Sequence, residues 1–120
     1  MATVLVIDDE EGFRSFLCDV LSDAGHEVTA AADGAAAIRE LARTRFDLVL
    51  TDQNMPRLDG IGLTKRLREH PGFRSTPILI LTTESSDQMK QAGRAAGATG
   101  WMVKPFDPVK LIEVIKKVVK

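Results

Sequence analysis

Short apolar runs alternate with segments of helical periodicity along the whole chain, and this alternation restricts the folds open to it more than any other feature. The run at residues 4–7 is continuously apolar, as expected of a strand that is covered on both faces. The next segment, 13–21, has apolar residues at i, i+3, i+4, i+7 and i+8, the stripe of an amphipathic helix. Four more such pairs follow, each a predicted strand and then a helix, with the strands at 27–31, 46–51, 77–81 and 100–103.

Helix boundaries are marked by capping residues. Asp33 and Asp107 are predicted N-caps of the second and fifth helices, and Pro108 suits the first position of the latter. Ser85 and Gln88 form the pattern of a capping box before the fourth helix, which is rich in alanine and glycine and is predicted to have little amphipathic character. Five strand–helix units without linker or repeat predict an α/β fold, with a parallel sheet covered on both faces.

Size and composition limit the number of domains, the binding partners and the cellular location that the chain can have. A chain of 120 residues fits one domain, predicted here at 1–120 and without an output domain. The net charge of −1 gives no basic surface that would favour nucleic acid or an anionic membrane. No apolar stretch approaches the ~20 residues of a membrane span, and the N-terminus lacks the basic region of a signal peptide. Cys18 is the only cysteine, which excludes an intrachain disulfide and favours a reducing, cytoplasmic location.

Carboxylates follow two of the buried strands. In open parallel sheets the loops at the carboxyl ends of the strands form the site, and here Asp8 and Asp9 follow the first strand and Asp52 the third. If these strands are neighbours, three like charges meet at one edge and raise one another's pKa, and a divalent cation would offset the repulsion. Oxygen ligands without histidine or cysteine favour Mg²⁺ over zinc or copper. The alternative is that Asp8 and Asp9 simply cap the first helix, although one aspartate would be enough for that.

Asp52 and two further strand-end residues suit phosphoryl chemistry. Asp52 follows a buried strand directly, and a carboxylate is a recognised covalent nucleophile for phosphoryl groups. Lys104, at the end of the fifth strand, would place a compact positive charge beside the phosphoryl oxygens. Thr82, at the end of the fourth strand, would donate a hydrogen bond to one of them. Taken singly, Lys104 would be read as a surface lysine and Thr82 as a structural threonine.

Together these segments resemble a known family. The pair Asp8-Asp9, the segment 52–60 (Asp-Gln-Asn-Met-Pro-Arg-Leu-Asp-Gly), Thr82 and the segment 101–106 (Trp-Met-Val-Lys-Pro-Phe) are similar to the receiver domain of two-component response regulators. The resemblance covers essentially the whole chain and is greatest to the single-domain chemotaxis regulators of the CheY type. It implies a flavodoxin-like, doubly wound sheet of five parallel strands in the order 2-1-3-4-5 with five helices.

The resemblance also implies roles for single residues. Asp52 would accept a phosphoryl group from a phosphohistidine on a histidine kinase, or from a small donor such as acetyl phosphate, while Lys104 and Thr82 contact the phosphoryl group. The implied Mg²⁺ ligands are Asp9, Asp52 and the main-chain carbonyl of Asn54, with Asp8 acting through a water. Asn54 and Glu84 would set the lifetime of the aspartyl phosphate at seconds to minutes. The Lys104–Pro105 peptide bond would be cis.

The implied switch moves the Thr82 hydroxyl toward the phosphoryl group, while an aromatic side chain on the fifth strand fills the space it leaves. The family usually has tyrosine or phenylalanine there, and this chain has Trp101, whose indole N–H needs a partner when it is buried. Trp101 therefore turns inward, or it stays outward as part of a binding face. The expected output face is the fourth helix, fifth strand and fifth helix, on which Ile112 and Val119 are either contact residues or peripheral core.

Other functions remain to be weighed. A phosphatase of the haloacid dehalogenase type needs a second aspartate two positions after the nucleophile, where this chain has Asn54, and the chain has no room for a cap domain. A flavodoxin-type FMN site would be repelled by Asp8-Asp9-Glu10. An unphosphorylated adaptor would have lost some of the site residues. We therefore expect a non-enzymatic, monomeric phosphoacceptor that signals to a protein target, in chemotaxis by preference, with a phosphorelay intermediate or a receiver excised from a larger regulator as alternatives.

Overall fold

The computed structural model describes residues 1–119, so Lys120, the last residue of the predicted domain, lies outside it. Strands and helices alternate as predicted. The strands are β1 (Thr3–Ile7), β2 (Glu27–Ala31), β3 (Leu48–Thr51), β4 (Ile78–Thr82) and β5 (Gly100–Val103). The helices are α1 (Glu11–Asp23), α2 (Gly34–Arg43), α3 (Gly60–Glu69), the short 3₁₀ helix η1 (Pro71–Phe73), α4 (Asp87–Ala96) and α5 (Pro108–Val118).

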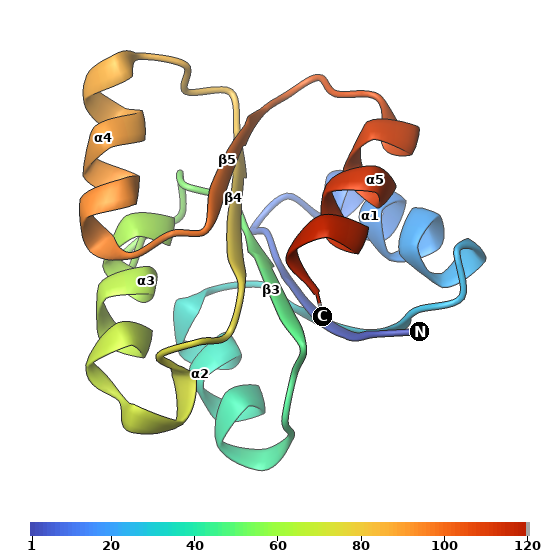
Figure 1. Cartoon of the computed structure of the whole chain (residues 1–120), viewed down its shortest axis with the longest axis horizontal. Coiled ribbons are helices and arrows are strands. Elements are labelled where there is room, and N and C mark those ends of the chain that lie inside the picture. Colours follow the sequence, from blue (N-terminus) through green and yellow to red (C-terminus); the bar gives the residue numbers. More distant parts are fainter. Residues whose placement is uncertain (120) are drawn as a thin grey trace.

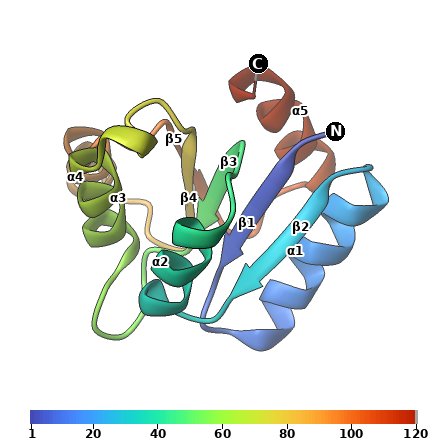
Figure 2. The ribbon, with the colours of Figure 1, turned by 90° about the horizontal axis from the view of Figure 1, so that it is seen from below.

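All five strands are parallel and lie in the order β2-β1-β3-β4-β5, which confirms the order implied by the family resemblance. Helices α1 and α5 cover one face of the sheet, and α2, α3 and α4 cover the other (Figures 1 and 2). Strands β1 and β3 are direct neighbours, with Ile7 paired to Thr51. The residues that follow these two positions, Asp8 and Asp52, therefore emerge side by side at one edge of the sheet.

Alternation along the central strands divides the core into two layers. Val4 and Val6 of β1 are buried with α1 and α5, and Leu5 and Ile7 are buried with α2 and α3. The inner strands are buried almost throughout, whereas β2 and β5 at the edges are only partly covered. Ile112 and Val119 pack at the margin of the α1–α5 layer and are peripheral core. None of the described helices is long and apolar enough to cross a bilayer.

Most of the predicted caps are present. Asp33 and Asp107 accept hydrogen bonds from the first turns of α2 and α5. The predicted cap Ser85 is wrong by one residue, because it is the Ser86 hydroxyl that accepts from the Met89 N–H. The cap of α1 is Glu10, whose carboxylate accepts from two N–H groups of the first turn. The interpretation of the aspartate pair as helix caps is therefore also wrong, and both aspartates are left for other contacts.

The fourth helix differs from the sequence prediction, because it has a distinct buried face. Gly93 and Ala96 on this face are buried against Ile80 of β4 and Trp101 of β5. Small residues contribute little to an apolar pattern, which is why the sequence suggested no amphipathic stripe. Here they are required, because a Cβ at Gly93 would lie 2.9 Å from two ring atoms of Trp101.

The close approach of α4 to the indole predicts the effect of Gly93→Ala. Alanine favours a helix by up to ~1 kcal/mol over glycine, but the added methyl displaces the Trp101 ring, and overpacking costs about 1–3 kcal/mol. We expect a net destabilisation of about 1 kcal/mol in urea unfolding and a red shift of the tryptophan emission. In a Trp101→Leu background the same change should stabilise the protein. Equal destabilisation in both backgrounds would contradict the proposed contact.

Candidate functional site

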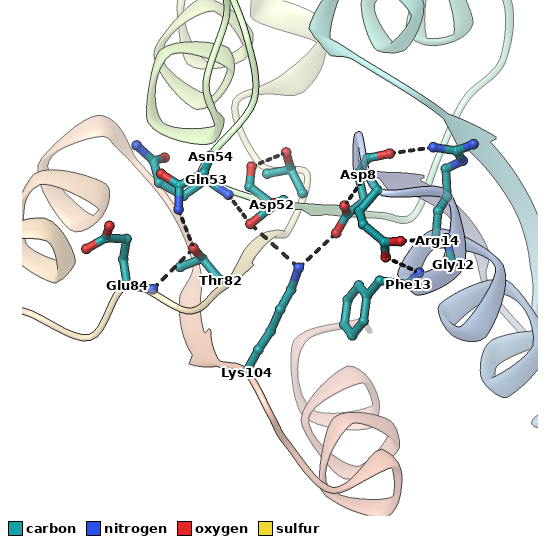
Figure 3. A network of polar contacts seen from close by, with 12 residues as sticks. Asp8, Gly12, Phe13, Arg14, Asp52, Gln53, Asn54, Thr82, Glu84 and Lys104 are labelled. Carbon is teal, nitrogen blue, oxygen red and sulfur yellow. Dashed lines mark hydrogen bonds and ion pairs between the residues drawn. The ribbon is translucent and has the colours of Figure 1, made fainter.

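Three carboxylates meet at the carboxyl end of the sheet, and two of them, Asp8 and Asp52, are labelled in Figure 3. Asp8 follows β1 and is 1% exposed, Asp9 is exposed beside it, and Asp52 follows β3. One carboxylate oxygen from each lies within 4.8 Å of the others. Asp8 is fixed by the Glu10 N–H, which donates to its Oδ1 at 2.9 Å, and Asp52 by its own N–H, which donates to the Ile7 carbonyl at 2.9 Å. The convergence predicted from the strand ends is therefore present.

Lys104 brings a positive charge to this cluster from the end of β5. Its Nζ lies 2.9 Å from Asp8 Oδ2 and 3.7 Å from Asp52 Oδ1. The lysine side chain is 15% exposed and that of Asp52 is 11% exposed, so solvent screens these ion pairs only weakly. The Lys104–Pro105 peptide bond is cis, as the family resemblance implied.

The pKa of Asp52 is raised above its ordinary value. Burial of the carboxylate is the main cause, and the nearby charge of Asp8 adds to it. Lys104 and the main-chain N–H groups of Gln53 and Asn54 act in the opposite direction, by stabilising the carboxylate. The ionised carboxylate is therefore poorly solvated by water. A bound cation or electrophile would stabilise it by compensating its charge.

Thr82 lies at the same edge of the sheet, at the end of β4 (Figure 3). It is fully buried, and its hydroxyl oxygen accepts from the Glu84 N–H at 3.3 Å and from Asn54 Nδ2 at 3.4 Å. The two residues proposed to set the lifetime of a phosphoryl group are thus both joined to Thr82. The long, weak bonds leave the hydroxyl free to rotate toward another acceptor.

Trp101 is paired with Ile80 of β4 and is half-buried. Its Nε1–H donates to the main-chain carbonyl of Glu84 at 2.9 Å, and its ring packs with Ile80 and Ala96. The indole N–H therefore has the partner that burial demands. The bond also attaches the side chain of Trp101 on β5 to the loop that follows β4.

Sequence reasoning missed two residues that hold the site in shape. Gln53 is 3% exposed, and its side chain accepts from the Ile61 N–H at 2.8 Å and donates to Asp59 at 3.1 Å, which fixes the Asp52 loop to the start of α3. Arg14 Nη1 donates to the Asp8 carbonyl at 2.7 Å. A glutamine in a loop and an arginine on a helix are usually exposed, so nothing local in the sequence indicated either contact.

Comparison with known proteins decides the family. Residues 4–116 match the response regulator receiver domain. The chain belongs to this family. It is 34% identical to the chemotaxis protein CheY-3 of Vibrio cholerae over 96% of this chain and 89% of that protein. A solved structure of Vibrio cholerae chemotaxis protein CheY4 is 45% identical and superposes with a TM-score of 0.94 over 98% of both chains.

A third relative bears on the metal. The receiver domain of the Pseudomonas aeruginosa sensor histidine kinase PA1611, with a magnesium ion coordinated in its active-site cleft, is 28% identical. It superposes with a TM-score of 0.90 over 98% of this chain and 97% of that one. Receiver domains accept phosphate from histidine kinases in two-component signalling and are not enzymes in the ordinary sense, so this chain is a signalling module.

The receiver site fits Mg²⁺ on its own chemistry. The cluster of Asp8, Asp9 and Asp52 offers only carboxylate oxygens, which a small, hard divalent cation prefers. Asp9 is exposed to solvent and Asp8 is buried, so a cation can reach the cluster from solvent and keep some of its bound waters. The acidic cluster is therefore consistent with a receiver magnesium site.

Proposed function

We propose that this receiver domain takes a phosphoryl group from a histidine kinase onto Asp52 in a Mg²⁺-dependent reaction and thereby switches its contacts with other proteins. The observation that carries the proposal is that the Asp52 carboxylate belongs to a cluster of acidic oxygens and also lies 3.7 Å from the ammonium group of Lys104. The site thus offers both cation ligands and a positive charge beside Asp52, which is the arrangement that phosphoryl transfer needs.

The proposed reaction assigns a step to each side chain. An Asp52 oxygen attacks the phosphorus, a P–O bond forms, and the P–N bond to the donor imidazole breaks, which leaves an acyl phosphate. Lys104 neutralises charge on the phosphoryl oxygens, and Thr82 turns its hydroxyl toward one of them. Bound Mg²⁺ would neutralise charge on the transferred group. The proposed ligands are Asp9, Asp52 and the Asn54 carbonyl, with Asp8 acting through a water.

Magnesium should stabilise the folded protein. A ligand that binds only the native state adds about 2.7 kcal/mol at a hundredfold excess over its Kd, so we expect thermal denaturation to shift upward when Mg²⁺ is added to protein prepared in chelator. Asp9→Asn should remove most of the shift, because it removes a proposed ligand and leaves both ion pairs of Lys104 in place. Asp19→Asn, at an exposed position of α1, is the control and should keep the full shift. A full shift in Asp9→Asn would contradict the assignment.

Phosphorylation itself is tested with acetyl phosphate. Wild-type protein with Mg²⁺ should gain the mass of one phosphoryl group, and chelator should prevent the gain. After the donor is removed, the added mass should decay within minutes, because the family resemblance gives Asn54 and Glu84, which are both hydrogen-bonded to Thr82, the role of limiting the lifetime. Protein that gains no mass, or gains it equally in chelator, would overturn the proposal, and retention over many hours would overturn the proposed lifetime.

For the output we propose protein–protein signalling in chemotaxis through the α4–β5–α5 face. Next to Trp101 this face has a cavity of about 220 Å³ lined in part by Lys90 and Arg94, which would suit an acidic partner. The identities to the CheY proteins of Vibrio cholerae support this assignment. We further propose a cytoplasmic, monomeric regulator, with a phosphorelay intermediate or a receiver excised from a larger protein as alternatives.

A pull-down from source lysate, with and without the phosphoryl mimic beryllofluoride, separates these possibilities. Capture of a flagellar motor protein only in the presence of the mimic would support chemotaxis. Capture of a histidine phosphotransfer protein instead would favour a relay and contradict the chemotaxis proposal.

A further inference from the structure

The ammonium group of Lys104 has a third neighbour besides its two carboxylates. Nζ lies 3.9 Å from the centroid of the Phe13 ring, on α1, and Figure 3 shows the ring beside the end of the lysine side chain. A lysine ammonium has three N–H groups. Asp8, Asp52 and the face of the Phe13 ring surround it. A cation over an aromatic face is attracted by the negative potential of the ring.

The Phe13 ring is itself held in place. Phe106 meets it edge to face, with centroids 5.9 Å apart and planes at 89°, and Phe16 packs on it at 5.9 Å. The main-chain N–H of Phe13 is bonded to the carboxylate of Glu10, the cap of α1. Phe106 follows Lys104 by two residues, so the β5–α5 loop contacts the ring through both its lysine and its phenylalanine. The ring is therefore a rigid surface, whereas the four-carbon stem of the lysine is flexible.

We infer that Phe13 is a positioning residue for Lys104. The inference rests on the proposed function of the site. When a phosphoryl group occupies Asp52, the ammonium must turn toward the phosphoryl oxygens, and its distances to the carboxylates, now 2.9 Å to Asp8 and 3.7 Å to Asp52, change. The ring contact needs no exchange, because it depends on neither carboxylate. Phe13 thus keeps the ammonium beside Asp52 before and after phosphorylation, and restricts the conformations open to the long, flexible lysine side chain.

Position 13 lies on the apolar stripe of the first helix, so its sequence pattern predicts a core residue of any apolar type. An aliphatic side chain of similar size would satisfy that pattern and would offer no negative face to the ammonium. The inference therefore predicts that an aromatic ring, and not merely an apolar side chain, is required at this position.

The first test measures geometry and needs neither metal nor phosphodonor. In protein labelled with ¹³C-lysine, the ε-methylene protons of Lys104, assigned with Lys104→Arg, should be shifted upfield by the Phe13 ring current. The shift should vanish in Phe13→Leu and largely return in Phe13→Tyr. Phe73→Leu, at a half-buried phenylalanine on the opposite face of the sheet, should leave it unchanged. An unshifted Lys104 signal in the wild type would overturn the inference.

The second test measures the consequence. Phe13→Leu should slow phosphorylation by acetyl phosphate about three- to tenfold, the range of a partly desolvated cation–aromatic contact, while the Mg²⁺ affinity stays near wild type. Phe13→Tyr should restore most of the rate. In a Lys104→Ala background Phe13→Leu should have no further effect. An equal slowing in that background overturns the inference. A wild type that accepts no phosphoryl group refutes the proposed function, and the methylene shift still decides the contact.

Discussion

Asp52→Asn is expected to abolish phosphoryl incorporation completely, because a neutral amide has almost the shape of the carboxylate but no nucleophilic oxygen. The substitution leaves the fold in place, since the amide oxygen still accepts from the Gln53 N–H that now donates to Asp52 Oδ1 at 2.8 Å. Intact mass after incubation with acetyl phosphate and Mg²⁺ measures the effect. Asp19→Asn, which removes an exposed carboxylate on α1, should incorporate as much as the wild type.

The same variant should be more stable than the wild type in chelator at neutral pH. The pKa of Asp52 is raised in the folded protein, mainly by burial. A carboxyl with a raised pKa favours the folded state when it is protonated, and this contribution is lost as pH rises from the ordinary value of 3.8 through the folded pKa. In urea unfolding, the free energy of unfolding of Asp52→Asn should therefore rise relative to that of the wild type across that pH range, until the difference is roughly 1 kcal/mol. A wild type that is the more stable at neutral pH would contradict the burial argument.

Gly60→Ala should damage both stability and phosphorylation. A Cβ at Gly60 would lie 2.5 Å from the Asp52 carbonyl and 3.1 Å from Gln53 Cα, and main-chain atoms cannot rotate away. The loop and the start of α3 must separate, which strains the Gly60 N–H bond to the Gln53 carbonyl and shifts the Asp52 side chain. Overpacking of this kind costs about 1–3 kcal/mol. The free energy of unfolding, measured in urea, and the initial rate of phosphorylation should both fall.

Gly72→Ala is the matched control for that prediction. Its new methyl would meet an exposed imidazole, that of His70, no closer than 3.3 Å, and a flexible side chain can move aside. Stability and phosphorylation rate should stay close to wild type. If Gly60→Ala behaved in the same way as Gly72→Ala, the claim that the Asp52 loop packs too closely on α3 to admit a methyl group would be contradicted.

The sequence predicted those parts of the protein that depend on local pattern. Strand and helix types follow from apolar periodicity, and the caps Asp33 and Asp107 from side chains that compete for the first free N–H groups of a helix. The convergence of Asp8 and Asp52 followed once β1 and β3 were taken as neighbours. The strand order itself came from family resemblance, because nothing in the pattern of five similar units fixes which strands pair.

The features that sequence reasoning missed depend on contacts between distant segments. Gln53 was unremarkable until α3 was placed beside its loop, and Phe13 indicated only an apolar position until Lys104 was placed beside its ring. The buried face of α4 was missed because its residues are small. Their small size is what leaves room for the Trp101 ring. Each of these contacts forms only after packing, so no local window of the sequence contains it.

The most direct measurement of the central claim is the location of the acyl phosphate. Phosphorylated protein is treated with borohydride, which reduces an acyl phosphate to an alcohol and leaves free carboxylates intact, and the peptides are then sequenced by mass spectrometry. The proposed function predicts homoserine at position 52 and at no other position. Reduction at Asp8 or Asp9, or none at all in protein that had gained a phosphoryl mass, would contradict it.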